Sequence, residues 1–151
     1  MSDPGSTAPY DGWDDVRTEL EYRLRGLADG DVVVLGEPQQ QGPRRGLLRR
    51  SKPLPGRYVQ ALRTGDLLSG ECVGARLFGG DAEIAAEDHE RLRADGWLAP
   101  ADLVDTEPGY PNYRCDLPLD EAGVLARRQV EALVVLGLEP ADVVFEVPGR
   151  G

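Results

Sequence analysis

Residues 57–73 constrain the fold more than any other part of the chain, because they read as two short strands joined by a tight turn. Apolar and polar side chains alternate over residues 57–63, and a second short run follows over residues 68–73. Between them, Thr64-Gly65-Asp66 supplies a glycine that tolerates the backbone angles of a tight turn. The segment is therefore predicted to be an antiparallel β-hairpin that pairs residues 57–63 with residues 67–73.

An amphipathic helix is predicted to begin after Asp11, which is a good N-cap residue. Its apolar residues recur at spacings of three, four, four and three positions, which makes one continuous helical stripe. They are Trp13, Val16, Leu20, Leu24 and Leu27. Asp29-Gly30 ends this helix, and residues 31–35 follow as a strand that is apolar on both faces, as in the interior of a sheet.

Two further helices and two further strands are predicted after the hairpin. An acidic helix covers residues 81–95 and has only a thin apolar stripe. The third helix has Asp120 as its N-cap and Gly137 just after its C-terminus. Short strands are predicted over residues 113–117 and 143–147.

The element order is therefore α-β-β-β-α-β-α-β. Sequential hairpins favour an antiparallel sheet, so the predicted fold class is α+β, a small twisted antiparallel sheet flanked by helices. The length of 151 residues fits one domain. We expect that domain over residues 10–147, between a disordered tail at 1–9 and a short tail at 148–151.

Charge is distributed unevenly along the chain. The net charge is −10, yet residues 43–63 contain seven Arg or Lys residues and no acid. An acidic body repels nucleic acid at long range, so no nucleic-acid partner is expected. The basic loop at residues 39–54 is interrupted throughout by Pro and Gly, which leaves two interpretations open: a solvated loop, or a local contact with an acidic partner.

Several features indicate a cytoplasmic protein without a membrane partner. No apolar run approaches the roughly 18–20 residues that a membrane span needs. Residues 1–9 lack the basic and apolar regions of a secretory signal. Cys72 and Cys115 lie on separate predicted strands and neither belongs to a C-x-x-C pair, so both are expected to be free buried thiols.

The sequence contains no constellation of catalytic or metal-binding residues, so we expect no enzymatic activity, cofactor or metal. His89 is the single histidine, and no nucleophile lies near it in the sequence. Glu83, Glu87 and Asp88 have neither the spacing of a calcium loop nor the His and Cys of a transition-metal site. Residues 42–46 lack the G-K-[ST] ending of a phosphate-binding loop.

The order of these features resembles the YbjN-like and type III secretion chaperone-like (TY-Chap) domain family. The resemblance covers about residues 10–138. It rests on a W-x-x-V-x-x-x-L helix from Trp13, on Tyr58-Val59-Gln60, on Glu71, on Gly96-Trp97, and on L-G-L-E-P at residues 136–140. It implies a non-enzymatic bacterial protein, frequently a homodimer, with helices packed on a small twisted antiparallel sheet.

The resemblance also implies a binding site. Secretion chaperones hold an extended segment of a client protein in apolar grooves over the first helix and the sheet. Transferred to this sequence, that groove places the candidate client-binding residues at Val16, Leu20, Tyr58 and Gln60.

Two interpretations of the surface compete with client binding. Trp13, Tyr22, Tyr58 and Trp97 are large amphipathic side chains of the kind favoured as interface anchors, but Trp13 and Trp97 are expected in the core rather than on the surface. An acidic protein can also be an immunity or antitoxin-type inhibitor that binds a basic partner protein through the acidic faces of residues 12–27 and 81–95. Binding steered by charge weakens steeply with ionic strength, whereas binding in an apolar groove does not.

Removal of residues 39–54 is expected to leave the stability nearly unchanged. Loop length enters the closure entropy only logarithmically, and a segment with this much Pro and Gly offers little to a core. Thermal unfolding of the shortened chain tests this. Each kcal/mol of lost stability lowers the melting temperature of a chain of this length by roughly 2–4 °C. A melting temperature more than about 10 °C lower would therefore mean that the loop packs against the rest of the domain.

Overall fold

The computed structural model describes residues 12–37, 57–73, 84–99 and 112–146. The predicted tails at 1–9 and 148–151 and the basic loop at 39–54 lie outside the described residues.

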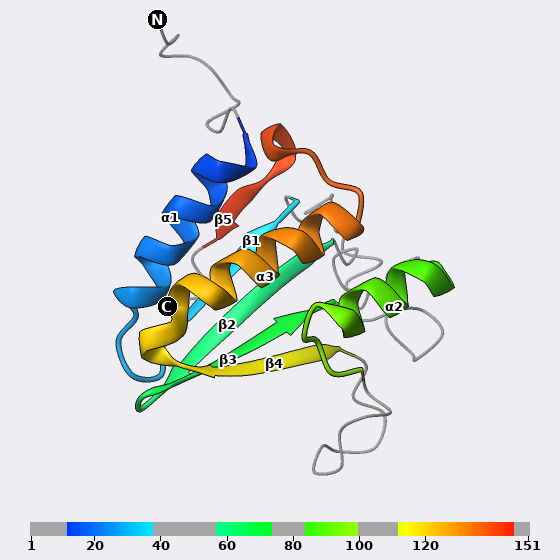
Figure 1. Cartoon of the computed structure of the whole chain (residues 1–151). Helices are drawn as coiled ribbons and strands as arrows, with labels where there is room; N and C mark the ends of the chain where they lie inside the picture. The colour runs from blue at the N-terminus through cyan, green and yellow to red at the C-terminus, as the bar shows by residue number, and fades with distance from the viewer. Residues whose placement is uncertain (1–11, 38–56, 74–83, 100–111, 147–151) are drawn as a thin grey trace, which may run out of the picture.

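A five-stranded sheet forms the centre of the structure (Figure 1). Its strands are β1 (Val32–Gly36), β2 (Tyr58–Thr64), β3 (Leu67–Cys72), β4 (Tyr113–Pro118) and β5 (Val144–Glu146). They lie in the order β4-β3-β2-β1-β5, and every neighbouring pair is antiparallel. The predicted interior position of the first strand is confirmed, because β1 pairs with β2 on one side and β5 on the other.

The β2–β3 hairpin is confirmed with the expected turn. Val59 pairs with Cys72 at one end, and Thr64 pairs with Leu67 beside the turn. Gly65 has a φ of 63°, in the left-handed region that glycine adopts without strain. Its amide donates to Asp29 Oδ1 at 2.8 Å, so the loop after the first helix holds the turn in place.

Three α-helices lie on one side of the sheet, as Figure 1 shows for α1 and α3 in front of the strands. They are α1 (Trp13–Arg25), α2 (Ala86–Ala94) and α3 (Ala122–Val135), and two short 3-10 helices flank α3, η4 (Leu119–Glu121) and η5 (Pro140–Asp142). The α+β class and the predicted element order are confirmed.

The helix starts differ from their predictions. The N-cap of α1 is Gly12 in extended conformation rather than Asp11, and no side chain caps it. Asp120 lies inside η4, so the N-cap of α3 is Glu121. The Leu119 amide donates to the Asp66 carbonyl at 2.7 Å, and this tertiary bond fixes a turn that the cap pattern does not reveal.

The second helix is shorter than predicted. Ala85 has the extended backbone of an N-cap, so α2 starts at Ala86 rather than at residue 81. Only Leu92 of this helix is buried. A helix with so little apolar surface gains little from packing, and packing supplies most of the stability of short helices.

The core lies between the sheet and the helices. The stripe of α1 points into it, because Val16, Leu20 and Leu24 are all less than 2% exposed. Trp97 is 1% exposed and therefore belongs to the core rather than to a surface. At the end of α3, Gly137 has a φ of 89°, which confirms its predicted position after the helix.

Close approach of α3 to the sheet depends on Gly70 in β3. A Cβ at this position would lie 2.8 Å from Leu125 Cδ1 and 3.0 Å from the Cys115 carbonyl oxygen. Beside it, the fully buried Gln129 donates from Nε2 to the Gln60 carbonyl oxygen at 2.8 Å. The absent side chain of Gly70 therefore lets α3 pack on the sheet and lets Gln129 reach a strand carbonyl.

The substitution Gly70→Ala is expected to destabilise the fold by about 1–3 kcal/mol, because the added methyl overpacks the contact with α3. At roughly 2–4 °C per kcal/mol, the melting temperature falls by several degrees. Gly26→Ala is the matched control, since its Cβ would meet nothing closer than 3.5 Å. An equal loss of melting temperature in the two variants would contradict this packing role.

Candidate functional site

The side of the sheet opposite the helices is called here the open face. Side chains alternate across each strand, so Val59 and Ala61 are buried against the helices while their neighbours in β2 point the other way. No helix of the described residues lies on that side. The open face consists of Val32, Val34, Tyr58, Gln60, Leu62, Leu67, Ser69, Glu71, Leu98, Arg114 and Asp116.

Exposed apolar side chains concentrate on the open face. Four large hydrophobic residues are exposed in the described part of the chain, and three of them lie there: Leu62, Leu67 and Leu98, at 38%, 40% and 46%. The fourth is Tyr22 on α1. Leu98 reaches the open face because it forms a bridge with Arg114 at the edge of β4. Leu62 and Leu67 lie on neighbouring strands near the β2–β3 turn, whereas Leu98 lies beyond β4, so the exposed leucines flank the open face at two places.

A polar cluster lies beside these leucines. Glu71 Oε1 accepts hydrogen bonds from Gln60 Nε2 and from Asn112 Nδ2, both at 3.1 Å. Asn112 Nδ2 also lies 3.4 Å from the Tyr58 hydroxyl. Residues from β2 and β3 and the residue just before β4 therefore hold one another in fixed positions on the open face.

The four residues that the sequence suggested for client binding do not share one groove. Val16 and Leu20 are 0% and 1% exposed under α1. Tyr58 and Gln60 are half-buried on the open face, with the sheet between them and the α1 stripe. The structure joins Tyr58 and Gln60 instead to Glu71 and to residues that the sequence analysis did not select.

The sequence predicts some of the open-face residues that were not selected as candidates, but not others. Leu62 and Leu67 follow from the alternation in β2 and β3 once the hairpin register is known, because side chains two apart share a face. Asn112 and Leu98 are brought to the open face by pairing between distant segments. Local sequence carries no signal for those two positions.

An ion pair fixes the end of the sheet at which Tyr58 lies. Arg57 donates from Nε and Nη2 to the carboxylate of Glu37 at 3.2 and 3.0 Å, and from Nη1 to the Leu136 carbonyl oxygen at 3.0 Å. The Arg57 guanidinium holds the pKa of Glu37 below its usual value, chiefly through these side-chain hydrogen bonds. The pair ties the β1–β2 end to the C-terminus of α3.

The two cysteines and the histidine lie in or beside the core. Cys72 and Cys115 are free and buried as predicted, and burial raises the pKa of both thiols. His89 Nδ1 lies 2.7 Å from the Tyr113 hydroxyl, and burial raises the pKa of Tyr113 to about 12. That contact joins α2 to β4. The described residues contain no group of three His, Cys, Asp or Glu that could hold a metal ion.

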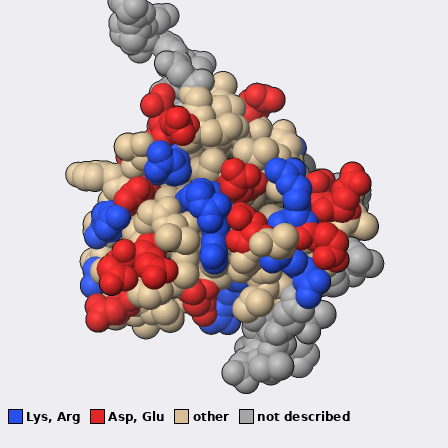
Figure 2. Space-filling view, in the orientation of Figure 1, with Lys and Arg blue, Asp and Glu red and all other residues tan. Residues whose placement is uncertain are grey.

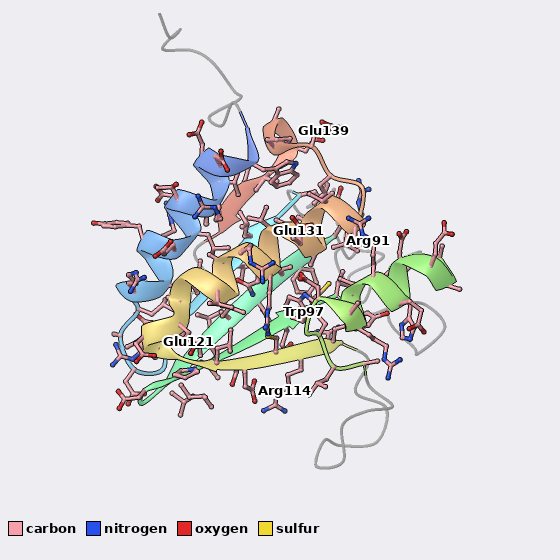
Figure 3. All side chains as sticks on the ribbon, viewed as in Figure 1. Arg91, Trp97, Arg114, Glu121, Glu131 and Glu139 are labelled. Atoms are coloured by element: carbon pink, nitrogen blue, oxygen red, sulfur yellow. The ribbon has the colours of Figure 1, made fainter. Side chains whose placement is uncertain are left out.

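The helix side of the molecule has a different character. Figure 2 shows basic and acidic side chains interspersed over this face. Several acids are paired there: Arg23 with Glu19 at 2.7 Å, and Arg127 with Asp95 at 3.3 Å. Across α2 and α3, Arg91 lies 3.9 Å from Glu131, two of the residues labelled in Figure 3. Partial neutralisation by arginine reduces the field that α1 and α2 offer a basic partner.

Taken together, these features define an α+β domain with a helix-covered face, an open face with exposed leucines, and, within its described residues, no helix long and apolar enough to cross a membrane. The chain belongs to the TY-Chap3 family, described as T3SS (YopN, CesT) and YbjN peptide-binding chaperone 3, whose model matches residues 6–148. No curated protein and no solved structure is detectably similar to it.

Replacement of Glu37 by Gln is expected to lower the melting temperature at pH 7 slightly. The lost ion pair is worth about 1 kcal/mol or less, because the Arg57 side chain is 42% exposed and solvent screens it. The pKa of Glu37 is lower in the folded state than its ordinary value of 4.5. The ion pair therefore stabilises the protein fully at pH values above 4.5. Its contribution disappears as the pH falls through the lower folded-state pKa.

Thermal unfolding of the wild type and Glu37→Gln between pH 3 and pH 7 measures this effect, and the two curves should approach each other as the pH falls below 4.5, the ordinary pKa of a glutamate. Glu131→Gln serves as the control, because its 3.9 Å pair with Arg91 is exposed and should contribute nothing measurable. A difference between wild type and Glu37→Gln that stayed constant across the range would show that the pair does not act through ionisation of Glu37.

Proposed function

We propose that this protein is a cytoplasmic peptide-binding chaperone that holds an extended segment of a client protein on its open face. The family supports the general role of binding peptides. The observation that favours the open face is the concentration of Leu62, Leu67 and Leu98 on a side of the sheet that no described helix covers. Tyr58 and Gln60 belong to that face and remain in the proposed site.

The stripe of α1 is less suited to the client. Val16 and Leu20 are already packed against the core, so a client that reached them would have to displace contacts within the monomer. Burial of a Val or Leu side chain stabilises a fold by about 1.5–3 kcal/mol, and that stabilisation would be lost on displacement. In this proposal Val16 and Leu20 support the sheet from behind, and the client contacts its other side.

Two alternatives to a client peptide, a second copy of the chain and a basic partner protein, can be distinguished from it by experiment. A second copy of the chain on the open face would bury the same leucines, and the molar mass in solution at different concentrations detects such a homodimer. An acidic inhibitor would bind through α1 and α2, where arginines already pair with several of the acids. Its binding would fall steeply with salt and would be unaffected by changes on the open face.

Variants of the open face are expected to lose peptide binding without losing stability. The probe is an array of immobilised 12-residue peptides that samples apolar, polar and charged compositions. Tyr58→Ala/Gln60→Ala and Leu62→Ser/Leu67→Ser should bind the array several-fold more weakly than wild type. Truncation of interface anchors typically costs 1–2 kcal/mol or more, whereas the exposed Leu62 and Leu67 contribute little to folding, so the Leu62→Ser/Leu67→Ser variant separates binding from stability most clearly.

The matched control is Tyr22→Ser, which removes an even more exposed apolar side chain, 75% exposed, from the helix side. Its binding should equal that of the wild type, and melting temperatures verify that each variant folds. Undiminished binding by both open-face variants, or an equal loss in Tyr22→Ser, would remove the open face from the proposal. Should the wild type bind no peptide, the chaperone function itself would fail.

A further inference from the structure

We infer that the open face selects client segments that carry a lysine or arginine side chain among apolar residues, and that Glu71 receives this cation. The inference rests on the proposed function, because it specifies which peptides the open face accepts. Three observations support it: the fixed geometry of the Glu71 carboxylate, the absence of an ion pair between Glu71 and any described Arg, Lys or His, and the apolar residues two strands away on either side of it.

Glu71 lies in the middle of the polar cluster and is held by neutral donors. Gln60 and Asn112 both donate to Oε1 at 3.1 Å, which fixes the orientation of the carboxylate. Neither bond uses Oε2. A carboxylate accepts up to about four hydrogen bonds, so the amides leave acceptor capacity for a ligand.

The charge of Glu71 is not neutralised within the described part of the chain. No Arg, Lys or His side chain there forms an ion pair with it, whereas its neighbour Arg114 is joined to Asp116 by two hydrogen bonds of 3.2 Å. Arg114 and Asp116 compensate each other, so one negative charge remains beside them. The chain as a whole carries −10, which also favours a cationic ligand over an anionic one.

The strand register places apolar side chains on both sides of this charge. One row runs across the open face from Val34 through Gln60, Glu71 and Arg114 to Leu98. Neighbouring strands are about 4.8 Å apart, so Val34 and Leu98 each lie two strands, or about 10 Å, from Glu71. In an extended peptide laid across the strands, side chains two positions apart share a face and lie about 7 Å apart, so the residues two positions before and after a central one point toward Val34 and Leu98. A segment with a central basic residue and apolar residues on both sides therefore matches the row.

The test uses the same array of 12-residue peptides, with each basic peptide paired with versions in which its Lys or Arg is replaced by Gln or by Glu. Wild type should bind the basic versions about five- to tenfold more strongly than the Gln versions, because a charge-assisted hydrogen bond is roughly twice as strong as a neutral one. The variant Glu71→Gln keeps an acceptor for Gln60 and Asn112 but removes the charge. It should bind all three versions alike.

Glu131→Gln is the control, because it removes one negative charge from the helix side and leaves the open face intact. It should retain the preference of the wild type for basic peptides. Equal binding of the basic and Gln versions by wild type, or a preference that survives in Glu71→Gln, would overturn the inference and leave the proposed function standing. Absence of binding to every peptide would instead reject the proposed function.

Discussion

The packing of α3 against the centre of the sheet is the contact on which the rest of the structure depends. It requires Gly70, where a side chain would collide with Leu125, and it brings the buried Gln129 to the Gln60 carbonyl. With α3 in place, α1 packs beside it and encloses the residues of its own stripe. The apolar residues of all three helices then face one side of the sheet, and no helix of the described residues covers the other side.

That asymmetry links the fold to the proposed function. A sheet face with exposed leucines beside a fixed polar cluster offers both apolar contact and directed hydrogen bonds to an extended chain. The polar residues matter because apolar contact alone distinguishes peptides poorly, whereas an unsatisfied or mismatched charge is costly to bury. The same face that α3 leaves uncovered can therefore combine broad binding with some selectivity.

The two ends of the sheet are held in different ways. At the β1–β2 end, Arg57 joins Glu37 to the last turn of α3 through charge-assisted hydrogen bonds. Near α2, the contacts are fewer: Leu92 is the one buried residue of that helix, and His89 bonds to the Tyr113 hydroxyl. Since local stability follows buried apolar contact, α2 is expected to open more readily than α1 or α3.

The sequence by itself determined the element order, the β2–β3 hairpin, the α1 stripe and the α+β class, because these follow from side-chain periodicity and turn residues that act locally. Its cap residues misplaced the starts of α1 and α3, and the helix predicted over residues 81–95 begins at Ala86. It also placed Val16 and Leu20 beside Tyr58 and Gln60, although the sheet lies between the two pairs. Only the tertiary structure decided which face α3 covers and which distant residues, such as Asn112 and Leu98, join Glu71 on the other. Those outcomes depend on register and close packing between segments far apart in the chain, and no local pattern encodes them.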